Sequence, residues 1–183
     1  MEPTTSAKSM TKPPTDESGE ATPGLGLSIV IPALDEANRL GRTLERIGVY
    51  ADQKRGRWEV IVVDDGSRDG TAELVRRGSW EPLEVRLLVN ECNRGKGFSV
   101  RRGMLAARGE LLLMCDADLS TPIEEIEKLL ACLERGCAVA IASRDMPDSR
   151  LDPPQPLRRR LMAWAFRAVR RRLLLPALRD TQC

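Results

Sequence analysis

Residues 111–118 read Leu-Leu-Leu-Met-Cys-Asp-Ala-Asp, an apolar run that ends in two carboxylates one residue apart. The continuous apolarity of residues 111–115 predicts a buried strand, and Thr121-Pro122 predicts the start of a helix soon after it. Asp116 and Asp118 then lie on a loop leaving a strand's carboxyl end, where open α/β sheets bind ligands. Two carboxylates at this spacing can share a divalent cation. The alternative is an Asp-rich turn that caps the next helix.

Apolar runs and amphipathic segments alternate along the chain. Strands are expected at residues 27–31, 59–63, 83–89, 111–115 and 137–142. Helices are expected at residues 36–49, 71–77, 122–134 and from the end of the turn-rich stretch 90–97 through Ala107. Such βα units with short loops predict an α/β fold, in which a mainly parallel sheet carries helices on both faces.

The composition of the 183 residues fits one globular domain, since 42% of them are apolar. Aromatic residues make up only 3%, which argues against stacking platforms for nucleic acid, so nucleic acid is not an expected partner. The five cysteines show neither metal-finger spacing nor a disulfide framework and are expected to be reduced thiols of a cytoplasmic protein. No apolar run is long enough for a membrane span.

Charge and composition divide the chain into three segments. Residues 1–24 are rich in Thr, Ser, Pro and charge and are expected to be a disordered tail, while residues 25–156 carry the βα units. Residues 157–183 hold eight Arg and one Asp, a net +7 within a total of +2, so the first 156 residues carry −5. The apolar residues of this last segment recur at helical spacing. It fits a basic amphipathic helix on an anionic membrane surface, or an ordinary packing helix.

Polar residues follow the first two predicted strands at the same sheet edge. Pro32, Leu34 and Glu36 come after the first strand, and Asp64 and Asp65 after the second. Carboxylates placed there can accept hydrogen bonds from a nucleobase or from ribose hydroxyls. The stretch that begins at Asp65 also fits a tight turn with a helix cap.

The stretch Asn93-Arg94-Gly95-Lys96-Gly97 after the third predicted strand combines two glycines with two cations. Glycine permits a close backbone approach, and N–H groups at the start of the following helix favour anions. The spacing differs from a Walker motif, and no strand leads into G-x-G-x-x-G. An anionic ligand other than a dinucleotide is therefore favoured.

Seven segments match the motifs of one known family in order. They are residues 28–36, 62–71, 93–104, 116–118, 143–144, 158–160 and 180–183. This ordered set resembles family 2 glycosyltransferases with the GT-A fold, in particular dolichyl-phosphate β-glucosyltransferases and polyprenyl-phosphate mannosyltransferases. The resemblance runs from residue 27 to the last residue.

The resemblance implies roles for individual residues. Asp116 and Asp118 would bind Mg²⁺ or Mn²⁺, and Asp118 and Asp180 would be catalytic. The implied donor-binding residues are Pro32, Leu34, Glu36, Asp64, Asp65, Arg94, Lys96, Asp116 and Ala117. Arg144, Arg158 and Arg159 would hold acceptor or donor phosphates, with plain surface charge as the alternative for the arginine cluster.

The chain contains no histidine, which excludes a Ser-His-Asp triad and a histidine base. A lipid monophosphate is largely dianionic at neutral pH, because its second pKa is about 6, and needs little proton removal before it attacks. The enzyme would position the reactants and stabilise the departing nucleoside diphosphate. The resemblance implies an inverting transfer of glucose from UDP-glucose to dolichyl or polyprenyl phosphate, by a protein peripheral to the cytoplasmic face of a membrane, and this chemistry is compatible with it.

Three alternatives remain open at this point. The sequence Asp-Ala-Asp-Leu-Ser at residues 116–120 also resembles the mannosyl branch, which would use GDP-mannose. The chain ends at Cys183, where the family continues with Gly-Phe-Lys, which favours a truncated chain and allows a nucleotide-sugar-binding module without activity. A cytosolic nucleotidyltransferase would use a similar sheet edge, but a Gly-rich triphosphate loop is missing from the sequence.

Overall fold

The computed structural model describes residues 26–55 and 57–142 and divides the chain into two compact units, Met1–Glu124 and Glu125–Cys183. The described part of the first unit contains a parallel sheet and three α-helices. The described part of the second contains α4 (Ile126–Glu134), and a 3-10 turn, η1 (Ile123–Glu125), spans the division. The single helix predicted at residues 122–134 is thus a 3-10 turn followed by a shorter α-helix.

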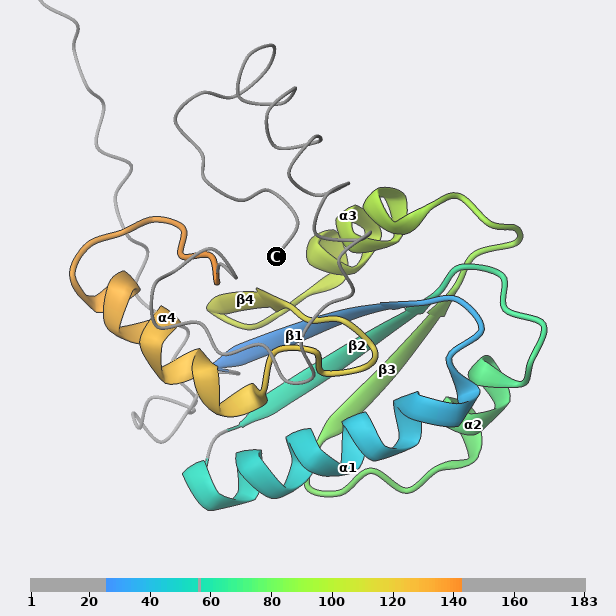
Figure 1. Ribbon diagram of the computed structural model, residues 1–183, viewed down its shortest axis with the longest axis horizontal. Helices are drawn as coiled ribbons and strands as arrows, with labels where there is room; N and C mark the ends of the chain where they lie inside the picture. The colour runs from blue at the N-terminus through green and yellow to red at the C-terminus, as the bar shows by residue number, and fades with distance from the viewer. Residues whose placement is uncertain (1–25, 56, 143–183) are drawn as a thin grey trace, which may run out of the picture. The chain divides into compact units, whose positions relative to one another are not determined.

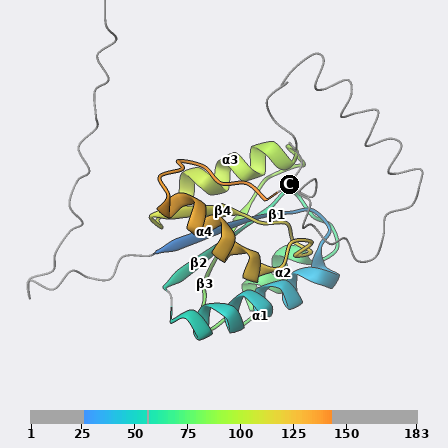
Figure 2. The ribbon, with the colours of Figure 1, turned by 60° about the vertical axis from the view of Figure 1, so that its left-hand side comes forward.

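The sheet has four strands in the described residues, all parallel, in the order β3-β2-β1-β4. The strands are β1 (Leu27–Ala33), β2 (Trp58–Asp64), β3 (Glu84–Val89) and β4 (Leu111–Met114). The helices between them are α1 (Ala37–Lys54), α2 (Thr71–Arg77) and α3 (Lys96–Ala106). Figure 1 shows α3 on one face of the sheet and α1 with α2 on the other, and Figure 2 shows the same separation. The predicted α/β class with helices on both faces is confirmed.

The core lies around β1 and β2, the two strands that have a neighbour on each side. Their β-branched residues at 29–31 and 60–63 have no exposed surface, as expected for strands covered on both faces. Helix α3 lies very close to this sheet, since a Cβ added at Gly103 would be only 2.3 Å from Cγ1 of Val30. On α1, Leu40, Leu44 and Ile47 recur at helical spacing and are buried.

Strand β4 is less buried than its apolar sequence predicts. Leu111 and Leu112 are 37% and 48% exposed, and β4 pairs only with β1 in the part of the sheet that the structure describes. The prediction of a buried strand at residues 111–115 is therefore wrong for its first half. Continuous apolarity is equally consistent with a strand at the edge of a sheet, because the pattern does not reveal which neighbours a strand has.

The strand predicted at residues 137–142 is also wrong, because the structure assigns no strand there. Val139 and Ile141 are 77% and 55% exposed. A strand is stabilised by ladder hydrogen bonds to a partner, and none of the four described strands pairs with this segment. The short apolar run alone could not predict whether such a partner exists.

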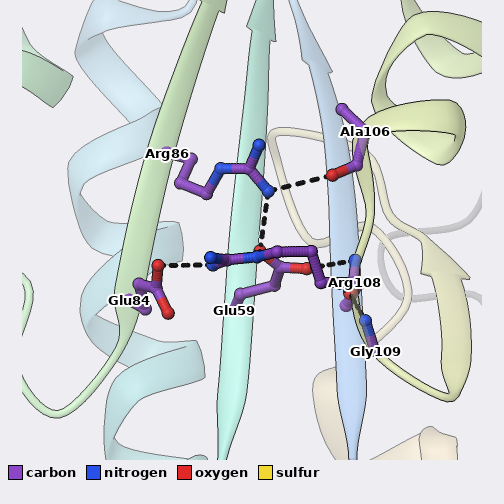
Figure 3. Close-up of polar contacts among 7 residues, drawn as sticks. Glu59, Glu84, Arg86, Ala106, Arg108 and Gly109 are labelled. Carbon is purple, nitrogen blue, oxygen red and sulfur yellow. Dashed lines mark hydrogen bonds and ion pairs between the residues drawn. The ribbon is translucent and has the colours of Figure 1, made fainter. Parts of the chain in front are cut away.

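A buried carboxylate, Glu59, joins three strands near their amino ends (Figure 3). Its oxygens accept hydrogen bonds from Ser28 Oγ at 2.6 Å, Arg86 Nη1 at 3.0 Å and the backbone N–H of Arg108 at 2.7 Å. The Arg108 side chain crosses Glu59 and reaches Glu84 on β3 (Figure 3). Burial by itself raises the pKa of Glu59, but these bonds outweigh it and lower the pKa to about 2.

Candidate functional site

The strands end together at one edge, from which the predicted site loops leave. The backbone N–H of Asp65 donates to the carbonyl oxygen of Ala33 at 2.8 Å, and that of Asn90 donates to Asp64 at 2.8 Å. These bonds continue the ladder one residue beyond β2 and β3. The loops after β1, β2 and β3 therefore begin side by side, and the pairing of β1 with β4 brings residues 115–120 to the same edge.

Asp116 and Asp118 lie on the loop that leaves β4, as predicted, and Asp118 is exposed. One oxygen of Asp118 accepts hydrogen bonds from the backbone N–H of Ser120 at 2.9 Å and from its hydroxyl at 2.7 Å. Burial by itself raises the pKa of Asp118, but these bonds and the charge of Arg39 lower it below its usual value. The carboxylate is thus held ionised, as a metal ligand must be.

Ala117, between the two carboxylates, is buried and fixed by the first helix. The Thr43 hydroxyl of α1 donates to the carbonyl oxygen of Ala117 at 2.7 Å. Thr43 was not predicted as a site residue. A polar residue next to Leu44, on the apolar face of this helix, was the available signal.

Lys96, at the start of α3, reaches the carboxylate motif. Its Nζ lies 2.7 Å from Oδ1 of Asp116, and the two side chains are 56% and 41% exposed. The structure thus joins two loops whose roles were predicted separately, the cationic stretch after β3 and the Asp-Ala-Asp motif after β4. Because both side chains are open to solvent, the contact itself contributes little to stability.

Arg94 precedes Lys96 on the same loop and is exposed. Its guanidinium lies over the ring of Phe98, 4.2 Å from the ring centre. This cation–π contact keeps the arginine against the first turn of α3.

Asp65 is buried and bonded to this loop rather than open to solvent. It accepts hydrogen bonds from the backbone N–H groups of Arg94 at 2.9 Å and Gly95 at 2.8 Å, and from the Asn90 amide at 2.6 Å. Burial by itself raises its pKa, but these donors and the Ser99 hydroxyl lower it below its usual value. Asn90 and Ser99 are further site residues that the sequence did not predict.

Asp64, the last residue of β2, is 2% exposed. Both of its carboxylate oxygens lie 3.4 Å from the backbone nitrogen of Ser67, so these hydrogen bonds are long. Pro32 was predicted to follow the first strand, but it lies within β1, where it pairs with Val63 and is half-buried. Leu34, on the loop after β1, is 42% exposed.

The loops after β1 and β2 hold each other in place. The backbone N–H of Asp35 donates to Ser67 Oγ, and that of Ala37 donates to Asp69 Oδ2, both at 2.9 Å. Glu36 donates its backbone N–H to Thr71 Oγ1 at 2.9 Å. These bonds show that the turn after Asp65 is structurally tied to the predicted donor loop.

The Glu36 carboxylate pairs with Arg39 of α1, with 2.8 Å between Oε2 and Nε. Arg39 also lowers the pKa of Asp118 by its charge. The same arginine thus pairs with Glu36 and acts electrostatically on Asp118.

Asp116 and Asp118 carry the oxygen ligands that a divalent metal such as Mg²⁺ prefers. Within residues 26–55 and 57–142, the structure contains no cluster of three or more His, Cys, Asp or Glu side chains that could enclose a metal ion. Mg²⁺ in proteins is commonly bound through one or two carboxylates together with substrate phosphates. Two adjacent carboxylates beside a cationic loop match that donor set.

The comparison with known families decides the identity of the chain. The model of "Glycosyl transferase family 2" matches residues 28–181. The chain belongs to glycosyltransferase family 2.

Curated relatives of this family 2 chain carry related names. It is 34% identical over 179 residues to a dolichyl-phosphate beta-glucosyltransferase of Drosophila melanogaster, covering 90% of this chain and 54% of the relative. It is 33% identical over 150 residues to a dolichol-phosphate mannosyltransferase of Mycosarcoma maydis, covering 80% of this chain and 51% of the relative. The chain thus spans about half the length of these two relatives.

A solved structure, S. aureus TarS 1-349 in complex with UDP-GlcNAc, resembles this family 2 chain with a TM-score of 0.50 and 24% identity. The match covers 60% of this chain and 31% of that one. At this identity the likeness concerns the fold alone. The predicted GT-A fold is confirmed.

Several predictions for the family 2 chain fall outside the described residues. They concern Asp180, Arg144, Arg158, Arg159, the tail at 1–24 and the basic segment at 157–183. Within the part that is described, no helix combines the length and apolarity that crossing a membrane requires.

Proposed function

We propose that this chain forms the donor-binding part of a hexosyltransferase that transfers a sugar from a nucleotide donor to a polyprenyl phosphate of the dolichyl type. Family membership and the names of the curated relatives support the reaction class. The observation that carries the proposal is the 2.7 Å contact between Lys96 and Asp116, because it places a cation and the carboxylate motif at one sheet edge.

In this proposal Asp116 and Asp118 hold Mg²⁺ or Mn²⁺. The bound cation would neutralise negative charge on the departing nucleoside diphosphate. Lys96, already in contact with Asp116, adds a second positive charge at the same place, and Arg94 adds a third on the preceding turn. Together these residues make leaving-group departure more favourable without proton transfer from a histidine.

The nucleoside and sugar would lie along the loops after β1 and β2. Glu36 and Asp64 would supply acceptors for base or ribose groups. Asp64 is buried, but within the described residues its carboxylate accepts only the two long bonds from Ser67, so a donor group could replace them. Leu34 offers exposed apolar surface, and Pro32 and Ala117 offer rigid backbone beside it.

The acceptor half of the site is proposed from the resemblance alone. Arg144, Arg158 and Arg159 would hold the lipid phosphate, and Asp180 would lie near the reacting carbon. A dianionic phosphate attacks without a base, from the side opposite the leaving group, which inverts the configuration. The basic segment 157–183 would hold the protein peripherally at the anionic cytoplasmic face of a membrane.

UDP-glucose is the proposed donor, and GDP-mannose is the second candidate because one relative is named a mannosyltransferase. The test is a panel of radiolabelled UDP-glucose and GDP-mannose with dolichyl phosphate and Mn²⁺, with extraction of labelled lipid. We expect labelled lipid from UDP-glucose and none in EDTA. Labelling from GDP-mannose alone would reassign the sugar.

Donor binding without any transfer would favour the second candidate function, a nucleotide-sugar-binding module. Failure to bind either donor would overturn both functions.

A further inference from the structure

The sequence predicts Asp65 as a direct donor contact, but its carboxylate faces the protein. It is 3% exposed, and its two oxygens together accept three hydrogen bonds, two from backbone N–H groups of the cationic loop and one from Asn90. Bonds to an ionised acceptor are roughly twice as strong as neutral ones. Most of the hydrogen-bonding capacity of Asp65 is therefore used on residues 94 and 95.

The turn after Asp65 approaches the same loop closely. Gly66 has φ +82°, and a Cβ added there would lie 3.1 Å from backbone atoms of both Cys92 and Asn93. A side chain at this position would thus be strained and would push the loop away. Two successive residues of β2's exit loop, 65 and 66, are shaped to hold residues 92–95.

The beginning of the loop, at Asn90, is fixed to α3. The Asn90 amide that contacts Asp65 also donates to Ser99 Oγ at 2.9 Å. Arg102 donates to Asn90 Oδ1 at 2.5 Å and to the carbonyl oxygen of Val89 at 2.7 Å. The loop is consequently held at its beginning by Arg102 and at its middle by Asp65.

Lys96 follows directly after Gly95. The backbone N–H of Gly95 donates to Asp65 Oδ2 at 2.8 Å. The Lys96 ammonium then reaches Asp116 on the other side of the site. A continuous path of contacts runs from the end of β2, through the loop, to the carboxylate motif after β4.

We propose that Asp65 is a positioning residue, which sets the loop at residues 93–96 so that Lys96 meets the donor's diphosphate, and that it does not contact the nucleoside. This inference rests on the proposed donor site. It separates the two adjacent aspartates by their bonds, because both are buried. In the part of the chain that the structure describes, the Asp64 carboxylate accepts only two long bonds from Ser67, whereas that of Asp65 accepts three short bonds from residues of the cationic loop and its neighbour Asn90.

The test measures the affinity of the full chain and of its Asp65→Asn variant for two ligands in the presence of Mn²⁺. The ligands are UDP and uridine, which lacks the phosphates. We expect Asp65→Asn to weaken the affinity for UDP about tenfold and to change the affinity for uridine by no more than about twofold. Exposed Glu91 lies on the same loop, so Glu91→Gln removes the same charge without touching residues 94 and 95 and should change neither affinity. An equal loss for UDP and uridine would overturn the proposal, because it would indicate direct contact with the nucleoside.

A double-mutant cycle gives the second test. In a Lys96→Met background, Asp65→Asn should weaken the affinity for UDP by less than about twofold, because the ammonium group that Asp65 positions has been removed. Full additivity of the two changes would contradict the proposed path through Lys96.

Amide hydrogen exchange tests the positioning independently of any ligand. The N–H groups of Arg94 and Gly95 should exchange faster in Asp65→Asn than in the parent chain or in Glu91→Gln. If the parent chain binds neither UDP nor uridine, the proposed donor site is overturned. If the Arg94 and Gly95 amides exchange equally fast in Asp65→Asn and in the parent chain, the positioning role is overturned. If Asp65→Asn does not fold, Asn90→Ala removes one of the same bonds, and the same preferential loss of UDP is expected.

Discussion

Carboxylates of this chain fall into two groups by burial and bonding. Glu59 and Asp65 are buried with several donors each, whereas Asp116 and Asp118 are open to solvent at the carboxyl edge of the sheet. A buried carboxylate without donors would cost several kcal/mol, so the donors of the first pair are a structural requirement. The second pair can exchange its present partners for a ligand.

Removing one exposed carboxylate should weaken metal binding directly. We expect Asp118→Asn to reduce Mn²⁺ affinity in the presence of UDP by roughly tenfold or more, since even outer-shell changes at metal sites reach that size. Electron paramagnetic resonance of free Mn²⁺ measures it. Asp52→Asn, an exposed aspartate on α1, is the matched control. Equal Mn²⁺ affinity in Asp118→Asn and the control would refute the metal assignment.

The buried Glu59 predicts a pH-dependent contribution to stability. Its folded pKa of about 2 lies below the ordinary value of 4.5, so the ionised form stabilises the fold fully above pH 4.5. This contribution is lost as the pH falls toward 2. Glu59→Gln should lower the free energy of unfolding by about 3 kcal/mol at neutral pH, with a smaller difference at low pH.

Urea unfolding at pH 6 and pH 3 measures this difference. Glu45→Gln, on the exposed face of α1, controls for the loss of one negative charge and should differ little from the parent. A Glu59→Gln deficit that stays the same at both pH values would rule out the assigned pKa.

Among the elements, α3 is the one that approaches the sheet most closely through a glycine. A Cβ at Gly103 would be 2.3 Å from Val30 and 3.0 Å from Val63, whereas one at Gly97 meets nothing within 4 Å. We expect Gly103→Ala to destabilise the chain by about 1–3 kcal/mol through overpacking. Gly97→Ala in the same helix should be neutral or stabilise by up to about 1 kcal/mol. Thermal unfolding distinguishes the two, and equal melting temperatures would contradict the close packing.

Element prediction from the sequence succeeded where periodicity and burial agree. The runs at 27–31 and 59–63 are both β-branched and central, and the structure extends them only slightly, to Leu27–Ala33 and Trp58–Asp64. The runs at 111–115 and 137–142 are as apolar but differ in their neighbours, and there the sequence misjudged burial or strand formation. Local pattern does not encode strand order.

The site loops were predictable for a related reason, and the contacts between them were not. Each loop follows an apolar run, so its position at the sheet edge followed from the parallel topology. The bonds from Asp65 to Arg94 and Gly95 join residues about 30 positions apart, and the bond from Thr43 to Ala117 joins residues 74 apart. Such pairs arise from tertiary packing, which single-residue patterns do not contain.

For the molecule as a whole, the charge asymmetry predicts salt-sensitive membrane binding. Residues 157–183 carry a net charge of +7. We expect the chain to sediment with vesicles containing anionic lipid at low salt and to be released as ionic strength rises.

Vesicles of neutral lipid and a variant with Arg158, Arg159 and Arg160 changed to Gln are the controls. Less of the parent chain should sediment with neutral vesicles, and less of the variant should sediment with anionic vesicles. Binding that is absent, or that does not respond to salt, would favour the packing-helix interpretation of this segment.

The strand order β3-β2-β1-β4 has a consequence for the chain as it leaves the ribosome. Strand β1 is made first, and one of its two partners, β2, follows within about 30 residues, but the other begins only at Leu111. Until then one side of β1 presents unpaired N–H and C=O groups beside mostly apolar side chains, which is a template for association with another chain. Addition of β4 moves this edge of the described sheet from the largely buried β1 to the shorter β4, and the Asp-Ala-Asp motif follows directly after that strand.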